Sequence, residues 1–207
     1  MRKFLNKLNK VAYDTNTCLK KFFVKKHKYC YLVHPMKYSV FSGGKRFRST
    51  IIINTGKIFN IDYKKLIMIG AAIECVHSYS LIHDDLPAMD DDNLRRGKLS
   101  THKKFNEFTA ILAGNSLLAL AFEILSSVNL KLSWKVKTEL IKTLAIYSGY
   151  AGLAGGQYFD LTFENKSISA KQIIDIQKNK INKKIKNYGI KSQDLLQSVE
   201  FILNRKF

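Results

Sequence analysis

A long apolar run that ends abruptly in aspartates limits what this chain can fold into. Residues 66–82 are almost wholly apolar. The length of this run and the helical spacing of its side chains predict a central buried helix rather than a strand. Pro87 should end that helix near Asp84 and Asp85, because proline cannot donate a backbone hydrogen bond and restricts the residue before it. The sequence therefore predicts a buried helix with carboxylates at its C-terminal end.

Helical spacing recurs along the rest of the chain, and no Asn-Gly turn between alternating strands is present. Further helices are expected at residues 4–23, 45–59, 105–128, 134–153, 169–186 and 192–206. No internal repeat and no linker divides the chain. We therefore predict an all-α bundle that forms a single domain over residues 1–207.

Composition narrows the class of protein. The 207 residues are 46% hydrophobic, and the three cysteines lack a Cys-x-x-Cys spacing, which predicts a folded domain in a reducing, cytoplasmic setting. The most apolar run, 111–125, is interrupted by polar residues, so no membrane span is expected. The basic N-terminus has no continuous apolar stretch, so no signal peptide is expected. The net charge of +19 is spread along the chain, without a zinc-finger or RNP-like pattern, so we expect no nucleic-acid partner.

The segment 80–101 carries five aspartates and two adjacent arginines. Asp84, Asp85 and Asp90 would converge at the helix end and repel one another unless a cation joins them. Carboxylates suit Mg²⁺, which proteins usually hold together with substrate phosphate oxygens. Arg95 and Arg96 can bind phosphate. A solvated acidic loop is the alternative, and it accounts well for the other two aspartates; the segment as a whole favours an anionic, metal-chelated substrate.

A second candidate site is the segment 43–48, GGKRFR. Paired glycines let the backbone approach a ligand closely, and cationic side chains at a helix N-terminus favour anions. The alternative is a flexible basic turn. His77 lies seven residues before Asp84 and shares its helix face, so it is either a ligand or a core histidine.

A glycine cluster at 152–156 is followed by Gln157. The glutamine can hydrogen-bond a polar ligand group, and a packing role is equally compatible with the sequence. Lys180 lies in the predicted basic helix at 169–186 and could reach a diphosphate.

These motifs occur in the order of a known family. GGKRFR at 43–48, ECVHSYSLIHDDLPAMDDDNLRRG at 74–97, LAGNSLLALAFEILS at 112–126 and GGQYFDL at 155–161 resemble motifs of the short-chain trans-polyprenyl diphosphate synthases, of the bacterial farnesyl diphosphate synthase type. The resemblance covers residues 35–182, and 187–207 resembles the family's C-terminus. It implies an isoprenoid-synthase-like helical bundle, usually a cytoplasmic homodimer. It also implies Mg²⁺-dependent condensation of isopentenyl diphosphate with an allylic diphosphate (dimethylallyl or geranyl) to give farnesyl diphosphate.

The resemblance also implies roles for individual residues. It places the catalytic step on Asp84, Asp85, Arg95 and Lys180. The implied ligands are Asp84, Asp85 and Asp90 for Mg²⁺; Arg95, Gln157 and Lys180 for the allylic diphosphate; and Lys45, Arg48, His77 and Arg96 for isopentenyl diphosphate. Tyr79 and Ser80 would influence product length, and the bulky Tyr79 resembles enzymes that stop at fifteen carbons.

The chain departs from the family after Lys180. It lacks the second aspartate-rich motif and passes directly to the C-terminal segment, as if several C-terminal core helices were deleted. Ile181, Asn115 and Leu99 replace the threonine, aspartate and proline usual in the family. Two interpretations follow: an enzyme with impaired activity, or a non-catalytic diphosphate-binding remnant or partner subunit of a complete synthase.

Overall fold

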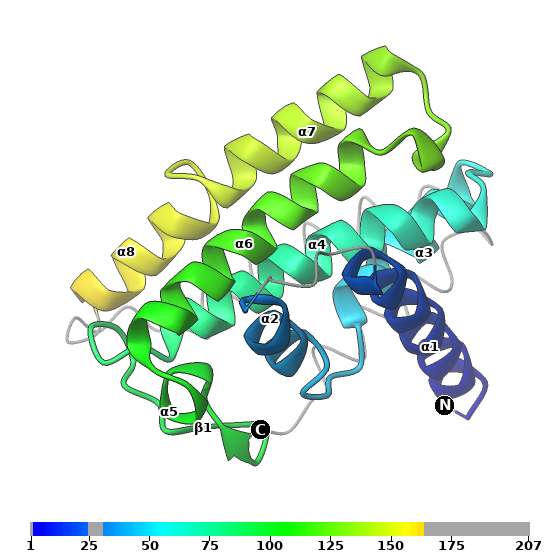
Figure 1. Ribbon diagram of the computed structural model, residues 1–207. Helices are drawn as coiled ribbons and strands as arrows, with labels where there is room; N and C mark the ends of the chain where they lie inside the picture. Colours follow the sequence, from blue (N-terminus) through cyan, green and yellow to red (C-terminus); the bar gives the residue numbers. More distant parts are fainter. Residues whose placement is uncertain (1, 25–30, 164–207) are drawn as a thin grey trace.

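Two long helices form the centre of the fold. The computed structural model describes residues 2–24 and 31–163, and in it α4 (Tyr63–Asp84) lies along α6 (Glu107–Ser126) (Figure 1). Completely buried side chains along the two helices include Ala71, Ala72, Cys75, Ala113, Leu117 and Ala121. Small residues at these positions let the helix backbones approach closely, and the leucine fills the space between them. The predicted central buried helix is confirmed.

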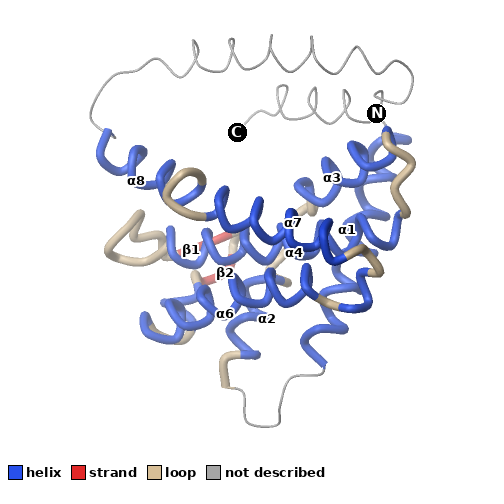
Figure 2. The backbone as a smooth tube through the Cα atoms, turned by 90° about the horizontal axis from the view of Figure 1, so that it is seen from above, coloured by secondary structure: helices blue, strands red, loops and turns tan. Residues whose placement is uncertain are grey.

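The remaining helices surround this pair. Helices α1 (Arg2–Val24) and α3 (Phe47–Ile58) pack against α4, while α2 (Val33–Val40) and the short α5 (Thr101–Lys104) pack against α6. On another side of α6 lies α7 (Trp134–Ser148), which follows the short 3₁₀ helix η1 (Val128–Leu130) and leads to α8 (Leu153–Phe163) (Figures 1 and 2). The all-α prediction is confirmed for the described residues.

Helix ends differ from the predicted ones for local reasons. The helix predicted from residue 45 begins at Phe47, because Arg46 adopts a left-handed conformation (φ 48°). The helix predicted over 105–128 begins only at Glu107, where the Asn106 side chain caps it by accepting from the Thr109 N–H at 2.9 Å. The helix predicted over 134–153 ends earlier, at Ser148, and a separate helix, α8, begins at Leu153 after two glycines. The helices predicted at 169–186 and 192–206 lie outside the described residues.

Sequence reasoning missed several short elements, including α2, α5, α8 and a hairpin. Helix α2 contains Pro35 in its first turn, where a helix needs no N–H donor. A small antiparallel hairpin pairs β1 (Leu94–Arg95) with β2 (Lys98–Leu99). Its turn residues Arg96 and Gly97 both have positive φ, 54° and 73°, as a type I′ turn requires. The sequence analysis did not find this hairpin because Arg-Gly stands where Asn-Gly is usual.

No membrane span was expected from the sequence, yet two helices are long and apolar enough for one by length and composition alone. Helices α4 and α6 meet both criteria, with mean hydropathies of 1.4 and 1.8 over their most apolar stretches. They are the two helices that pack on each other at the centre of the bundle. Their apolar character is that of core helices, which pass the same test.

Candidate functional site

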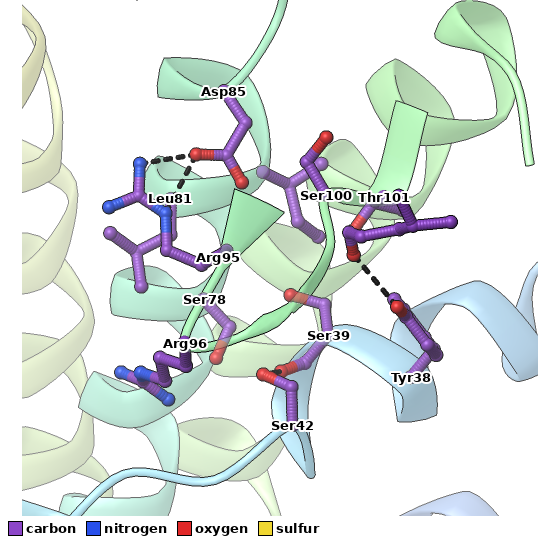
Figure 3. A pocket seen from close by; sticks show the side chains of 12 residues that line it. Tyr38, Ser39, Ser42, Ser78, Leu81, Asp85, Arg95, Arg96, Ser100 and Thr101 are labelled. Atoms are coloured by element: carbon purple, nitrogen blue, oxygen red, sulfur yellow. Dashed lines mark hydrogen bonds and ion pairs between the residues drawn. The ribbon is translucent and has the colours of Figure 1, made fainter. Parts of the chain in front are cut away.

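A pocket lies where the C-terminal end of α4 meets α2 and the hairpin (Figure 3). Its lining residues include Tyr38, Ser42, Ser78, Asp85, Arg95 and Arg96. The Tyr38 hydroxyl donates to the Leu99 carbonyl at 2.7 Å, which ties α2 to the hairpin. The hairpin therefore brings two adjacent arginines to the end of the helix that carries the predicted metal ligands.

Asp85 and Arg95 form an ion pair across this pocket (Figure 3). The Arg95 Nε donates to an Asp85 carboxylate oxygen at 2.8 Å, and its Nη2 donates to the same oxygen and, at 3.0 Å, to Asp92. Burial raises the pKa of Asp85, and the hydrogen bond from Arg95 offsets part of that rise. Two residues that were predicted to bind metal and diphosphate are thus bound to each other.

Asp84 and Asp90 lie close enough to influence each other's charge. The Asp90 N–H donates to the Asp84 carbonyl at 2.9 Å, which closes the turn after α4. Burial and then the Asp90 carboxylate raise the pKa of Asp84 from its ordinary value to about 6. Within the described residues no three His, Cys, Asp or Glu side chains gather as a metal group. The carboxylates of Asp90 and Asp85 both act on Asp84, while Asp85 also binds Arg95.

This donor set nevertheless fits a hard divalent cation. Asp84 is half-buried beside a second carboxylate, and burial with that carboxylate raises its pKa although Arg95 lowers it. Oxygen-only donors of this kind suit Mg²⁺, which keeps several water ligands and needs few from the protein.

Arg96, in the turn of the hairpin, belongs to a second group of cationic side chains. Arg96 donates from Nη1 to the Gly43 carbonyl and lies directly over Gly44, where an added Cβ would be 2.6 Å from that nitrogen. Burial, then Arg48 and Arg96, lower the pKa of His77 to about 3, so its imidazole is neutral at pH 7. Three predicted isopentenyl diphosphate ligands are therefore within electrostatic reach of one another, and the exposed Lys45 belongs to the same loop.

The remaining predicted site residues have varied surroundings. Tyr79 is half-buried and packs edge-on against His83, with ring centroids 4.8 Å apart. The Ser80 hydroxyl donates to the backbone carbonyl one turn earlier, at 3.0 Å. Gln157 is half-buried on α8, which packs against α7. Lys180 lies outside the described residues.

Sequence reasoning missed Asp92 and the buried pair formed by Arg46 and Glu74. Asp92 was assigned to a solvated loop, yet it binds Arg95. Glu74 is the only acidic residue within the apolar run 66–82, and a buried carboxylate normally needs a partner. That isolated acidic residue was the available signal for the Arg46–Glu74 ion pair.

Taken together, the chain is an all-α protein whose central helix ends in carboxylates faced by a cluster of arginines. Comparison with known proteins gives its family. The polyprenyl synthetase family model matches residues 30–189, and the chain belongs to that family.

Individual relatives agree with this assignment. The farnesyl diphosphate synthase of Buchnera aphidicola (subspecies Acyrthosiphon pisum) is 47% identical over 69% of this chain and 51% of its own length. The Escherichia coli farnesyl diphosphate synthase is 45% identical over 72% of this chain and 50% of its own. This chain thus spans about half the length of these curated relatives.

Solved structures show the same partial match. An apo structure described as an FPP/GFPP synthase from Zymomonas mobilis is 42% identical, with a TM-score of 0.75 over 80% of this chain and 60% of that one. A geranyltransferase from Legionella pneumophila is 35% identical, with a TM-score of 0.77 over 84% and 62%. The isoprenoid-synthase-like bundle is therefore confirmed for the described residues, over about 60% of the length of these structures.

Proposed function

We propose that this protein binds isopentenyl diphosphate and an allylic diphosphate on opposite sides of the hairpin, and that it retains prenyltransferase chemistry directed at farnesyl diphosphate. The observation that carries the proposal is the placement of the two hairpin arginines. Arg95 binds Asp85 at the end of α4, next to Asp84. Arg96 binds the Gly43 carbonyl, in the loop that carries Lys45 and Arg48. Each arginine can bind one diphosphate.

The proposed site residues divide the work. Asp84, Asp85 and Asp90 would hold Mg²⁺, which when bound neutralises the charge that builds on a departing diphosphate. Arg95 and, from parts of the chain further along, Gln157 and Lys180 would hold the allylic diphosphate. Lys45, Arg48, His77 and Arg96 would hold isopentenyl diphosphate. A neutral His77 can donate one hydrogen bond to a phosphate oxygen without adding charge.

Catalysis further requires a dry cavity for the allylic cation. The apolar walls of α4 and α6 support such a cavity, and Tyr79 and Ser80 lie on α4 one turn before the aspartates. Their position supports a role in limiting product length, because a chain growing from the aspartates along α4 would meet the Tyr79 ring. We propose that replacing Tyr79 with Ala lengthens whatever product is formed.

Activity is proposed to be far below that of a complete synthase unless another chain contributes to the site, because the sequence lacks the second aspartate-rich motif. The second candidate is therefore a non-catalytic diphosphate-binding remnant or a partner subunit of a complete synthase. Incubation of the purified protein with isopentenyl diphosphate, geranyl diphosphate and Mg²⁺ measures turnover. Turnover equal to that of a complete synthase would refute the impaired enzyme, and no turnover with retained Mg²⁺-dependent binding would support the second candidate.

Binding itself is tested by titration with geranyl diphosphate with and without Mg²⁺. Replacing both Asp84 and Asp85 with Ala should abolish the Mg²⁺-dependent part under either candidate function. Retained Mg²⁺-dependent binding in that variant would contradict the metal assignment.

A further inference from the structure

Arg46 is a buried charge in the middle of an otherwise exposed basic loop. Only 3% of its surface is exposed, whereas Lys45 and Arg48 on either side are exposed. Its Nε donates to the Asn16 side-chain oxygen on α1 at 2.8 Å, and its Nη2 donates to the Val40 carbonyl at the end of α2. The loop is thus fastened to two helices through one guanidinium group.

The charge of Arg46 is balanced by Glu74 on α4. The Arg46 Nη1 lies 3.6 Å from one Glu74 carboxylate oxygen, and both side chains are almost completely buried. The other carboxylate oxygen accepts from the Ser49 N–H at 3.2 Å in the first turn of α3. The pair therefore joins α1, α2, α3 and α4 at one point. A buried ion pair whose remaining polar atoms are satisfied in this way is costly to break at one end only.

The backbone conformation of Arg46 explains why its side chain is buried while those of Lys45 and Arg48 are exposed. Arg46 has a φ of 48°, a left-handed conformation that a residue with a side chain adopts only when its surroundings hold it there. Its side chain points inward while Lys45 and Arg48 remain on the surface. Glu74 precedes His77 by one helical turn, so the same pair also fixes the loop relative to that imidazole.

We propose that the Arg46–Glu74 pair positions the anion-binding loop, holding Lys45 and Arg48 at a set distance from His77 and Arg96. This inference rests on the proposed function, since it names what prepares the isopentenyl diphosphate side of the same site. Arg46 and Glu74 are positioning residues, because neither reaches the ligand. Glu74 also neutralises Arg46, which leaves the exposed cations to bind phosphate.

The test separates positioning from stability. An Arg46→Met/Glu74→Met double variant removes both charges while keeping apolar volume, a replacement that is often neutral or stabilising. We expect its thermal midpoint to stay within about 5 °C of the parent. Its affinity for isopentenyl diphosphate, measured by calorimetry, should fall by roughly tenfold or more, because small misplacements of binding groups are costly. Mg²⁺-dependent pyrophosphate binding at the aspartates should change less. A Lys135→Met/Glu139→Met variant at exposed positions on α7 is the matched control.

A second measurement keeps the inference independent of the proposed function. Amide hydrogen exchange of residues 43–49 should become faster in the double variant, while exchange in α6 stays unchanged. If the parent binds no isopentenyl diphosphate, the proposed function fails, and hydrogen exchange still decides the role of the pair. Unchanged exchange in the loop overturns the inference. Unchanged isopentenyl diphosphate affinity in a folded double variant overturns it equally.

Discussion

Replacing Asp84 with Asn should stabilise the metal-free protein while removing its response to Mg²⁺. The pKa of Asp84 rises to about 6, first through burial and then through the Asp90 carboxylate. A carboxyl group whose pKa is raised by folding lowers the free energy of unfolding whenever it is ionised. The asparagine amide has nearly the same shape and carries no charge, so the variant avoids that cost.

The magnitude follows from the shift. A rise from 3.8 to about 6 is about two units, which would be close to 3 kcal/mol if the group were fully buried. Because Asp84 is half exposed, solvent screening reduces this, and we expect about 1 kcal/mol. The corresponding rise in the thermal midpoint is about 2–4 °C for a chain of this size.

The gain depends on pH in a defined direction. Below pH about 4 the aspartate is protonated in both folded and unfolded states, so the variant has no advantage. As the pH rises towards 6, the unfolded chain releases its proton first and the parent loses stability. Above pH about 6 the penalty on the parent is fully present.

Thermal unfolding at pH 4, 6 and 8, with and without Mg²⁺, measures both effects. Mg²⁺ should raise the parent midpoint at pH 8, because it binds only the folded state, and should leave Asp84→Asn unchanged. Glu139→Gln, at an exposed position on α7, is the matched control and should show neither effect. A variant that is less stable than the parent at pH 8 without metal would refute the reasoning.

Three further substitutions test the packing described above. Gly44→Ala should cost about 1–3 kcal/mol and weaken isopentenyl diphosphate binding, because its Cβ would lie 2.6 Å from the Arg96 Nη1 at a φ of +108°; chemical denaturation and calorimetry measure the two effects. Gly114→Ala should cost about 1–3 kcal/mol in chemical denaturation, since its Cβ would lie 2.4 Å from the His83 Nε2 between α4 and α6. Leu117→Ala removes a completely buried side chain and should cost about 2–5 kcal/mol by the same measurement.

Gly156→Ala provides the control for the two glycine variants. No atom lies within 4 Å of its added Cβ, and the residue is helical, so alanine there should stabilise by about 0.5–1 kcal/mol. If Gly44→Ala and Gly114→Ala were as stable as the parent, the close approaches assigned to those positions would be wrong. A Leu117→Ala loss below 1 kcal/mol would contradict the close packing of α4 against α6.

The sequence was most informative where one periodic pattern decided the structure. An apolar run as long as 66–82 is expected to form a helix. The observed α4 begins three residues before this run and ends two residues after it. Loop chemistry was harder to foresee. The hairpin at 94–99 depends on an Arg-Gly turn with two positive φ angles. Arg46 lies outside α3 because its side chain binds distant residues, and no local sequence pattern reveals those contacts.

The sequence predicted which residues belong to the candidate site better than it predicted which of them bind one another. The family resemblance implied the grouping of Arg48, His77 and Arg96, and in the structure the two arginines help to lower the pKa of His77. The pairing of Asp85 with Arg95 was not predicted. A sequence shows that both residues are charged, but it does not show which residue each one binds. Asp92 was assigned to solvent for the same reason.

The hairpin has a mechanical consequence for any pair of ligands that the pocket holds. Arg95 reaches Asp85 at the end of α4, and Arg96, the next residue, reaches the Gly43 carbonyl on the other side. Because Arg95 and Arg96 are adjacent, the separation of two anions bound to them is set by one peptide unit of fixed length. Inserting one residue between the arginines would change that separation while leaving every side chain present, so the spacing of two anions can be altered here without altering what binds them.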